Sequence, residues 1–137
     1  MLVFVSGPLG DESRWSENVG AACEVGDVLA WMGCAVFVPH CYVEWHRQSP
    51  ANYEEWITRD LAVLRHCNAV VRLPGESPGA DREVAEWRRL TGGSTDNTGV
   101  RVVAGVPRDP ILRFPALLLP EGWTAQDLID GVWAWGG

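Results

Sequence analysis

The chain has 137 residues and a mass of 15.1 kDa, a length typical of one domain with its own hydrophobic core. Its net charge of −7 argues against a nucleic-acid polymer as partner, because binding to a phosphate backbone requires a basic surface. A small anionic ligand remains compatible with this charge, since a few backbone amides are enough to bind it.

The cysteines and histidines indicate no metal or disulfide chemistry. The four cysteines show neither CxxC spacing nor the density of a disulfide framework, so we expect a reduced, cytoplasmic setting. His40, Cys41 and His46 match no metal-site spacing, and we expect neither a metal nor another cofactor. The chain opens on the apolar run Leu2–Val5 without a basic region or a long apolar segment, so we expect no signal peptide and no membrane contact.

Strand and helix patterns alternate along the first half of the chain. In order, the sequence predicts a strand at Leu2–Ser6, a helix at Ser16–Met32, a strand at Ala35–Val38, a loop from Cys41 to Asn52 and a helix at Tyr53–His66. Each predicted strand is a short apolar run that ends in a glycine, a proline or a polar residue.

The second half continues the alternation. It predicts a strand at Ala69–Leu73, a helix at Ala80–Leu90, a turn at Thr91–Thr98, strands at Val100–Ala104 and Ala116–Leu119, and a last helix from Thr124 to about Trp135. Such alternation indicates an α/β fold, a parallel sheet of about five strands with helices on both faces. Ligands of such sheets bind beyond the carboxyl ends of the strands, where residues 6–14, 39–52 and 74–82 form loops.

The segment LPGESPGADRE, residues 73–83, combines turn residues with a helix start. Its glycines permit a tight turn after the strand, and Pro78 suits the first turn of a helix. The amides of Gly79, Ala80 and Asp81, with the Ser77 hydroxyl beside them, would then form a cradle for a phosphate or a carboxylate. An ordinary surface turn remains the alternative.

Two carboxyl groups near this segment are candidates for catalysis. Glu83 falls in the first helical turn and could attack an electrophilic sugar carbon. Asp60, on the preceding helix, could hand a proton to a leaving base if its pKa rises beside Glu83. The competing interpretations are that Glu83 only complements the helix dipole and that Asp60 lies on a solvated face. His40, at the end of the second strand, either contacts a ligand or is an ordinary packed or exposed histidine.

Together these motifs resemble the nucleoside 2-deoxyribosyltransferase-like superfamily. The matching segments are VFVSGPLG near the start, VPH after the second strand, and the run from Asp60 to Glu83, in which Ser77-x-Gly79-x-x-x-Glu83 is similar to the family's S-x-G-x-x-x-E signature. The similarity to short phage and bacterial members covers roughly residues 1–107. Residues 108–137 would then be a C-terminal extension of one domain spanning residues 1–137.

The resemblance implies a flavodoxin-like or Rossmann-like fold and cleavage of an N-glycosidic bond. Glu83 would form a glycosyl-enzyme intermediate, and Asp60 would protonate the departing base. The implied substrate-binding residues are Ser6, Gly7, Ser77 and Gly79, and His40 joins them as a candidate from its position at the end of the second strand. Family members are commonly dimers or larger, so a homo-oligomer is expected, with the tryptophan-bearing tail from Trp123 to Trp135 as a candidate interface.

Two positions depart from the family pattern. Phe4 stands where members often carry a tyrosine that orients the nucleophile, so either Tyr42 or Tyr53 replaces it or the orientation is weaker. Asn68 stands where the family has an acid just before the third strand.

The leading functional hypothesis is an N-glycosidase that hydrolyses a (deoxy)nucleoside 5′-monophosphate, since Ser77 and the amide-rich turn suit a phosphate. The alternatives are a nucleoside deoxyribosyltransferase, a phosphoribohydrolase of the cytokinin-activating type, and a nucleotide-binding sensor without turnover, which the missing hydroxyl at Phe4 favours. Candidates for stacking on the base are Trp15, Trp45 and His46.

Overall fold

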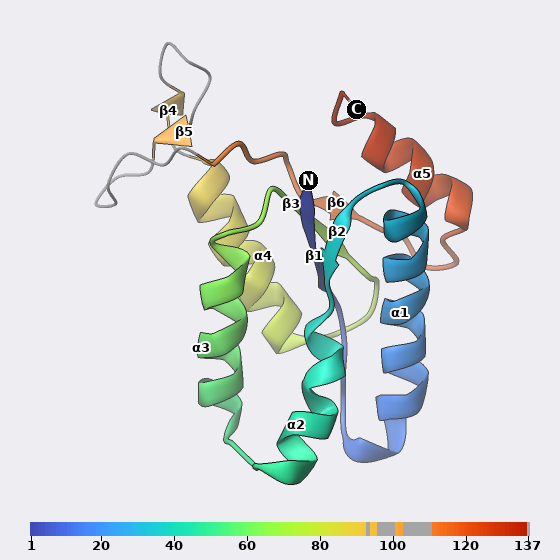
Figure 1. Ribbon diagram of the computed structural model, residues 1–137, viewed down its shortest axis with the longest axis vertical. Coiled ribbons are helices and arrows are strands. Elements are labelled where there is room, and N and C mark those ends of the chain that lie inside the picture. Colours follow the sequence, from blue (N-terminus) through green and yellow to red (C-terminus); the bar gives the residue numbers. More distant parts are fainter. Residues whose placement is uncertain (93, 96–100, 103–110, 137) are drawn as a thin grey trace.

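The computed structural model describes residues 1–92, 94–95, 101–102 and 111–136. Its centre is a parallel sheet of four strands in the order β2-β1-β3-β6, flanked by helices on both faces (Figure 1). The strands are β1 (Leu2–Ser6), β2 (Ala35–Phe37), β3 (Ala69–Arg72) and β6 (Leu117–Leu118). The predicted α/β class is confirmed, with four strands in this sheet rather than about five.

The strand predicted at Val100–Ala104 does not join the parallel sheet in its described part. Residues Arg101–Val102 form β5, which pairs antiparallel with β4 (Ser94–Thr95) in a separate two-stranded sheet. An antiparallel neighbour close in sequence needs only a short turn, whereas a parallel partner needs a long crossover. Residue 100 and residues 103–104 of the predicted strand lie outside the described residues, as does part of the predicted turn at 91–98.

The helices form two layers. On one face of the sheet α1 (Trp15–Trp31) packs beside α5 (Ala125–Trp133), and on the other α3 (Tyr53–Leu64) packs beside α4 (Pro78–Thr91) (Figure 1). All four were predicted, and none of their ends differs from the prediction by more than two residues. The loop predicted between Cys41 and Asn52 instead contains a 3-10 helix, η2 (Pro39–Tyr42), and the short helix α2 (Val43–Gln48). A further 3-10 helix, η1 (Glu12–Arg14), precedes α1.

Alternation along the central strand divides the core into two clusters. Val3 and Val5 of β1 face α1 and α5, whereas Phe4 faces the other way and packs with Leu64 and Trp87 on the side of α3 and α4. All five of these side chains are completely buried. Side chains of even number in β1 therefore point toward α3 and α4.

The C-terminal segment is part of these layers. β6 pairs with β3, and α5 packs against α1. Thr124, where the sequence predicted this helix to begin, caps α5 in a reciprocal pair with Asp127. Among the described residues, no helix combines the length and the apolar character needed to cross a membrane.

Candidate active site

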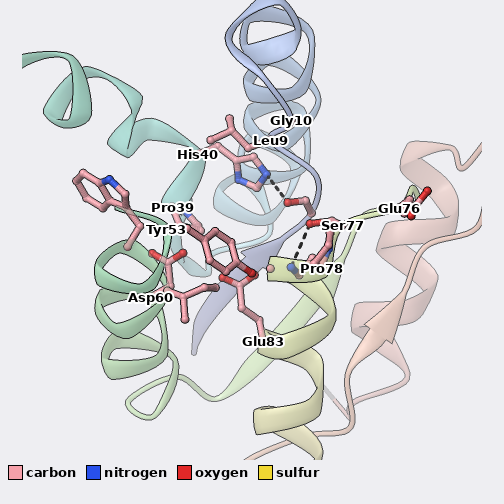
Figure 2. A pocket seen from close by; sticks show the side chains of 15 residues that line it. Leu9, Gly10, Pro39, His40, Tyr53, Asp60, Glu76, Ser77, Pro78 and Glu83 are labelled. Carbon is pink, nitrogen blue, oxygen red and sulfur yellow. Dashed lines mark hydrogen bonds between the residues drawn. The ribbon is translucent and has the colours of Figure 1, made fainter. Parts of the chain in front are cut away.

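A cavity of about 600 Å³ opens beyond the carboxyl ends of β1, β2 and β3 (Figure 2). Its walls come from the loop after β1, the start of η2, one face of α3 and the first turns of α4. In a parallel α/β fold the helices run opposite to the strands, so α3 and α4 both begin at this edge. The topology therefore brings the three predicted loops together.

Glu83 lies at the base of this cavity, and a hydrogen bond from the protein interior fixes its carboxyl group. Its side chain is 4% exposed, and the hydroxyl of Ser6 donates a hydrogen bond to Oε1 over 2.8 Å. Ser6 is the last residue of β1 and is completely buried. The sequence analysis expected Ser6 to contact the ligand. In the structure Ser6 is not among the residues that line the cavity, and it contacts Glu83 from the protein interior.

Asp60 faces Glu83 across the gap between α3 and α4 (Figure 2). Burial raises the pKa of Asp60 to about 6, against a weaker opposing effect of a hydrogen bond with Glu83. Burial, followed by the charge of Asp60, raises the pKa of Glu83 well above its usual value. Two carboxyl groups in such contact titrate as a pair and share one proton over a range of pH.

The surroundings of the pair are asymmetric. The hydrogen bond from Ser6 and the positive charge of Arg72 both act to lower the pKa of Glu83. By contrast, Oδ1 of Asp60 is buried and has no hydrogen-bond partner in the described part of the chain. Ser6 and Arg72 therefore favour a charge on Glu83, whereas the hydrogen bond within the pair acts the other way, lowering the pKa of Asp60 and raising that of Glu83.

Ser77 and the start of α4 form a less open cradle than the sequence indicated. The Ser77 hydroxyl oxygen caps the helix by accepting from the Ala80 amide over 3.1 Å, and the Asp81 amide donates to the Ser77 carbonyl over 2.9 Å. Two of the three amides predicted to hold an anion are thus engaged. The Gly79 amide and the hydroxyl proton of Ser77 have no acceptor within the described part of the chain and remain for a ligand.

Arg72 braces the turn between β3 and α4. Its guanidinium donates to the carbonyls of Leu73 and Gly75, the latter over 2.9 Å, and pairs with Asp81 at 3.2 Å. Gly75 adopts a φ of +112°, and a Cβ there would lie 2.9 Å from Cγ of Pro8. A glycine is therefore required where this turn approaches the first loop.

His40 and Gly7 shape the opposite wall. His40 is 4% exposed, and its Nε2 lies 3.2 Å from the Gly7 carbonyl oxygen. Burial lowers the pKa of His40, so the imidazole is neutral and donates to Gly7. A Cβ on Gly7 would lie 2.9 Å from Cβ of Leu73, which explains the glycine at this close approach. Gly7 and His40 both line the cavity, and the hydrogen bond from His40 to Gly7 also holds the first loop in place.

Aromatic side chains on α3 complete the site. Tyr53 and Trp56 line the cavity together with Asp60, at spacings of three and seven residues that place them on one helical face. The Tyr53 hydroxyl lies 3.5 Å from the position a Cβ on Gly79 would take. The sequence analysis did not name Trp56 as a site residue, although its spacing of four residues from Asp60 places the two on one face of α3.

The described residues offer no metal site, since they contain no group of three or more His, Cys, Asp or Glu side chains arranged to hold an ion. The cavity is also poor in positive charge. Its described lining includes three carboxyl side chains and neither lysine nor arginine. Of the three, Glu76 points away from the pair formed by Asp60 and Glu83 (Figure 2).

No protein-family model matches this sequence, and comparison with curated proteins gives no match. Among solved structures, the chain is similar to a 2-deoxyribosyltransferase from the psychrotolerant bacterium Bacillus psychrosaccharolyticus, with 21% sequence identity and a TM-score of 0.42. The similarity covers 64% of this chain and 65% of that one.

Proposed function

We propose that the protein cleaves the N-glycosidic bond of a nucleoside, with Glu83 as nucleophile and Asp60 as acid. The observation that carries this proposal is the buried pair of carboxyl groups, both with raised pKa, at the base of a cavity. Breaking a glycosidic bond requires one ionised and one protonated carboxyl group, and a pair that shares a proton provides both.

The reaction has two steps. Ionised Glu83 attacks the anomeric carbon and forms a C–O bond while the C–N bond breaks. The electron pair of the C–N bond leaves with the base, which takes the proton of Asp60. In the second step Asp60, now ionised, accepts a proton from the attacking acceptor, whose oxygen or nitrogen binds the anomeric carbon and releases Glu83. The Ser6 hydroxyl positions Glu83 throughout and takes the place of the hydroxyl that is missing at Phe4.

The cavity suits a neutral nucleoside better than the 5′-monophosphate preferred from the sequence. A phosphate would meet the negative charge of the carboxyl pair with no lysine or arginine among the described lining residues. The helix-end amides that motivated the phosphate are largely engaged. Hydrolysis and transfer to a second base share the first step, so both remain within the proposal. The sensor hypothesis loses its main support, because Ser6 supplies a hydroxyl to Glu83.

Two further predictions go with this function. A homo-oligomer stays a prediction, for which Trp133 of α5, 61% exposed, is available as a contact. Trp135 is less available, since its ring stacks on Phe114 at 5.9 Å and its indole N–H donates to the Pro115 carbonyl. The cytoplasmic location likewise stays a prediction.

The test is base release from a panel of ribo- and deoxynucleosides and their 5′-monophosphates, followed by chromatography with and without a second free base. We expect release from at least one nucleoside, and a fall of at least about 1,000-fold in Glu83→Gln. Glu24→Gln, which changes an exposed carboxylate on α1, is the matched control and should keep full activity. Intact-mass measurement of a quenched reaction should detect the glycosylated protein.

Undiminished base release by the Glu83→Gln variant would refute the assignment of Glu83 as the nucleophile. Saturable binding without release from any substrate would instead support the sensor. Release that requires the second base would identify a transferase, and release only from monophosphates would reverse the preference for a nucleoside.

A further inference from the structure

A second cavity of about 210 Å³ adjoins the candidate active site. We call this smaller cavity the aromatic annexe, because five side chains with aromatic rings line it: Trp15, Tyr42, His46, Tyr53 and Trp56. It shares four lining residues with the larger cavity: Leu9, Gly10, Tyr53 and Trp56. The two cavities are therefore neighbours along one wall, and nothing in the proposed reaction has so far used the smaller one.

The annexe lies on the Asp60 side of the carboxyl pair. Trp56 and Asp60 are four residues apart on α3 and thus share a face one turn apart. Tyr42 is also close to Asp60, since burial and then the charge of Asp60 raise the pKa of Tyr42. In the proposed reaction the departing group takes its proton from Asp60, so this is the side on which it must lie.

The annexe is held in place without a ligand. The guanidinium of Arg59 lies over two indole rings, 4.4 Å from the centroid of Trp56 and 4.6 Å from that of Trp45. The indole N–H of Trp56 donates to Nδ1 of His46 over 2.9 Å. Trp56 is thus fixed from two directions, which reduces the ordering cost of binding a flat ligand against it.

His46 provides one directed polar group among these rings. Its Nδ1 accepts from the Trp56 indole N–H and from the Ala51 amide, the latter over 3.3 Å. Because both neighbours are donors, Nδ1 carries the lone pair and the ring proton is on Nε2. Nε2 has no acceptor among the described residues and is not fully buried. His46, which lines the annexe, therefore offers it an N–H donor beside the aromatic walls.

We propose that the aromatic annexe binds the base of the substrate, with the Nε2–H of His46 donating to a ring nitrogen or carbonyl oxygen of a planar heterocycle. The assignment rests on the proposed function for the sugar-bearing end of the ligand. The ring walls supply stacking and edge contacts, which tolerate different heterocycles, while His46 selects for an acceptor on the ring edge. A flat ligand without such an acceptor would leave the donor unpaired.

Binding of two free probes tests this without any chemistry. Purine and indole have the same bicyclic shape, but indole lacks the ring-nitrogen acceptors. By isothermal titration we expect purine to bind the wild-type protein about tenfold more tightly, as one hydrogen bond provides. His46→Leu should remove this difference, and the matched change of an exposed histidine, His66→Leu, should keep it. Trp15→Leu should weaken both probes several-fold, unlike Trp31→Leu, which alters a 79% exposed tryptophan.

His46→Gln guards against loss of fold, because its amide can still accept from Trp56 and donate to the probe; we expect it to retain part of the purine preference. Equal binding of purine and indole to the wild type, an unchanged preference in His46→Leu, or unaltered binding in Trp15→Leu would each overturn the proposal. Probe binding needs no turnover, so failed base release with intact purine binding would refute the proposed function alone. Normal base release with no purine preference would refute the annexe alone.

Discussion

Replacing Asp60 with Asn should stabilise the protein at neutral pH while it removes the proposed acid. The folded-state pKa of Asp60 is raised from 3.8 to about 6. Protonated Asp60 therefore makes its full contribution to the free energy of unfolding below pH about 4, and this contribution is lost as the pH rises through about 6. A displacement of roughly two units at about 1.36 kcal/mol each gives at most about 3 kcal/mol by pH 7, since the half-buried side chain keeps some hydration.

The assay is urea unfolding followed by tryptophan fluorescence at pH 4 and pH 8. We expect Asp60→Asn to gain up to about 3 kcal/mol in free energy of unfolding at pH 8, and well under about 1 kcal/mol at pH 4. Asp27→Asn changes an exposed carboxylate on α1 and should show the same small difference at both values. An equal change in the free energy of unfolding at the two pH values would refute the view that burial beside Glu83 disfavours the ionised form of Asp60.

Three further substitutions probe the site and its support. Ser6→Ala should lower kcat about 10- to 100-fold and move the acid limb of the pH–rate profile upward, because loss of the hydrogen bond raises the pKa of the nucleophile; an unmoved limb would argue for a packing role. Asn68→Asp should destabilise the protein by about 1–2 kcal/mol at pH 8 and less at pH 3 in urea titrations, because an ionised carboxylate cannot donate to the Leu112 carbonyl as the amide does. Gly75→Ala should lower the free energy of unfolding by about 1–3 kcal/mol through its positive φ, whereas Gly20→Ala, on α1 with open space around it, should raise it by about 0.5–1 kcal/mol.

The sequence carried the main features of the site because they depend on local pattern and on topology. Alternating strands and helices place Gly7, His40 and Ser77 at one edge of a parallel sheet, whatever the details of packing. The spacing of Glu83 within the first turns of its helix directs it to the same edge. The approach of Asp60 to Glu83 then follows from α3 and α4 packing side by side.

Other features depended on contacts that no local pattern expresses. Alternation in β1 puts Ser6 on the same face as Phe4, yet only the packing of α4 against that face shows that Ser6 meets Glu83. Helix α2 lacks an apolar stripe, so its segment resembles a loop in sequence. Aromatic contacts hold it instead, such as that between Trp45 and Trp56, whose ring centroids lie 5.0 Å apart. The capping of α4 by Ser77 was likewise hidden, because a serine before a helix suits both a cap and a ligand site.

The hydrogen bond between Ser6 and Glu83 joins residues 77 positions apart and ties the proposed nucleophile to β1, an inner strand of the sheet. The side chains of residues 3–6 are fully buried, so amides of β1 should exchange with solvent only through global unfolding. His46 sits on α2, a six-residue helix without a buried side chain, whose amides should exchange through small local openings. The two ends of the ligand would thus be received by regions of unequal stability: a heterocycle in the annexe should slow exchange in α2 and leave β1 unchanged.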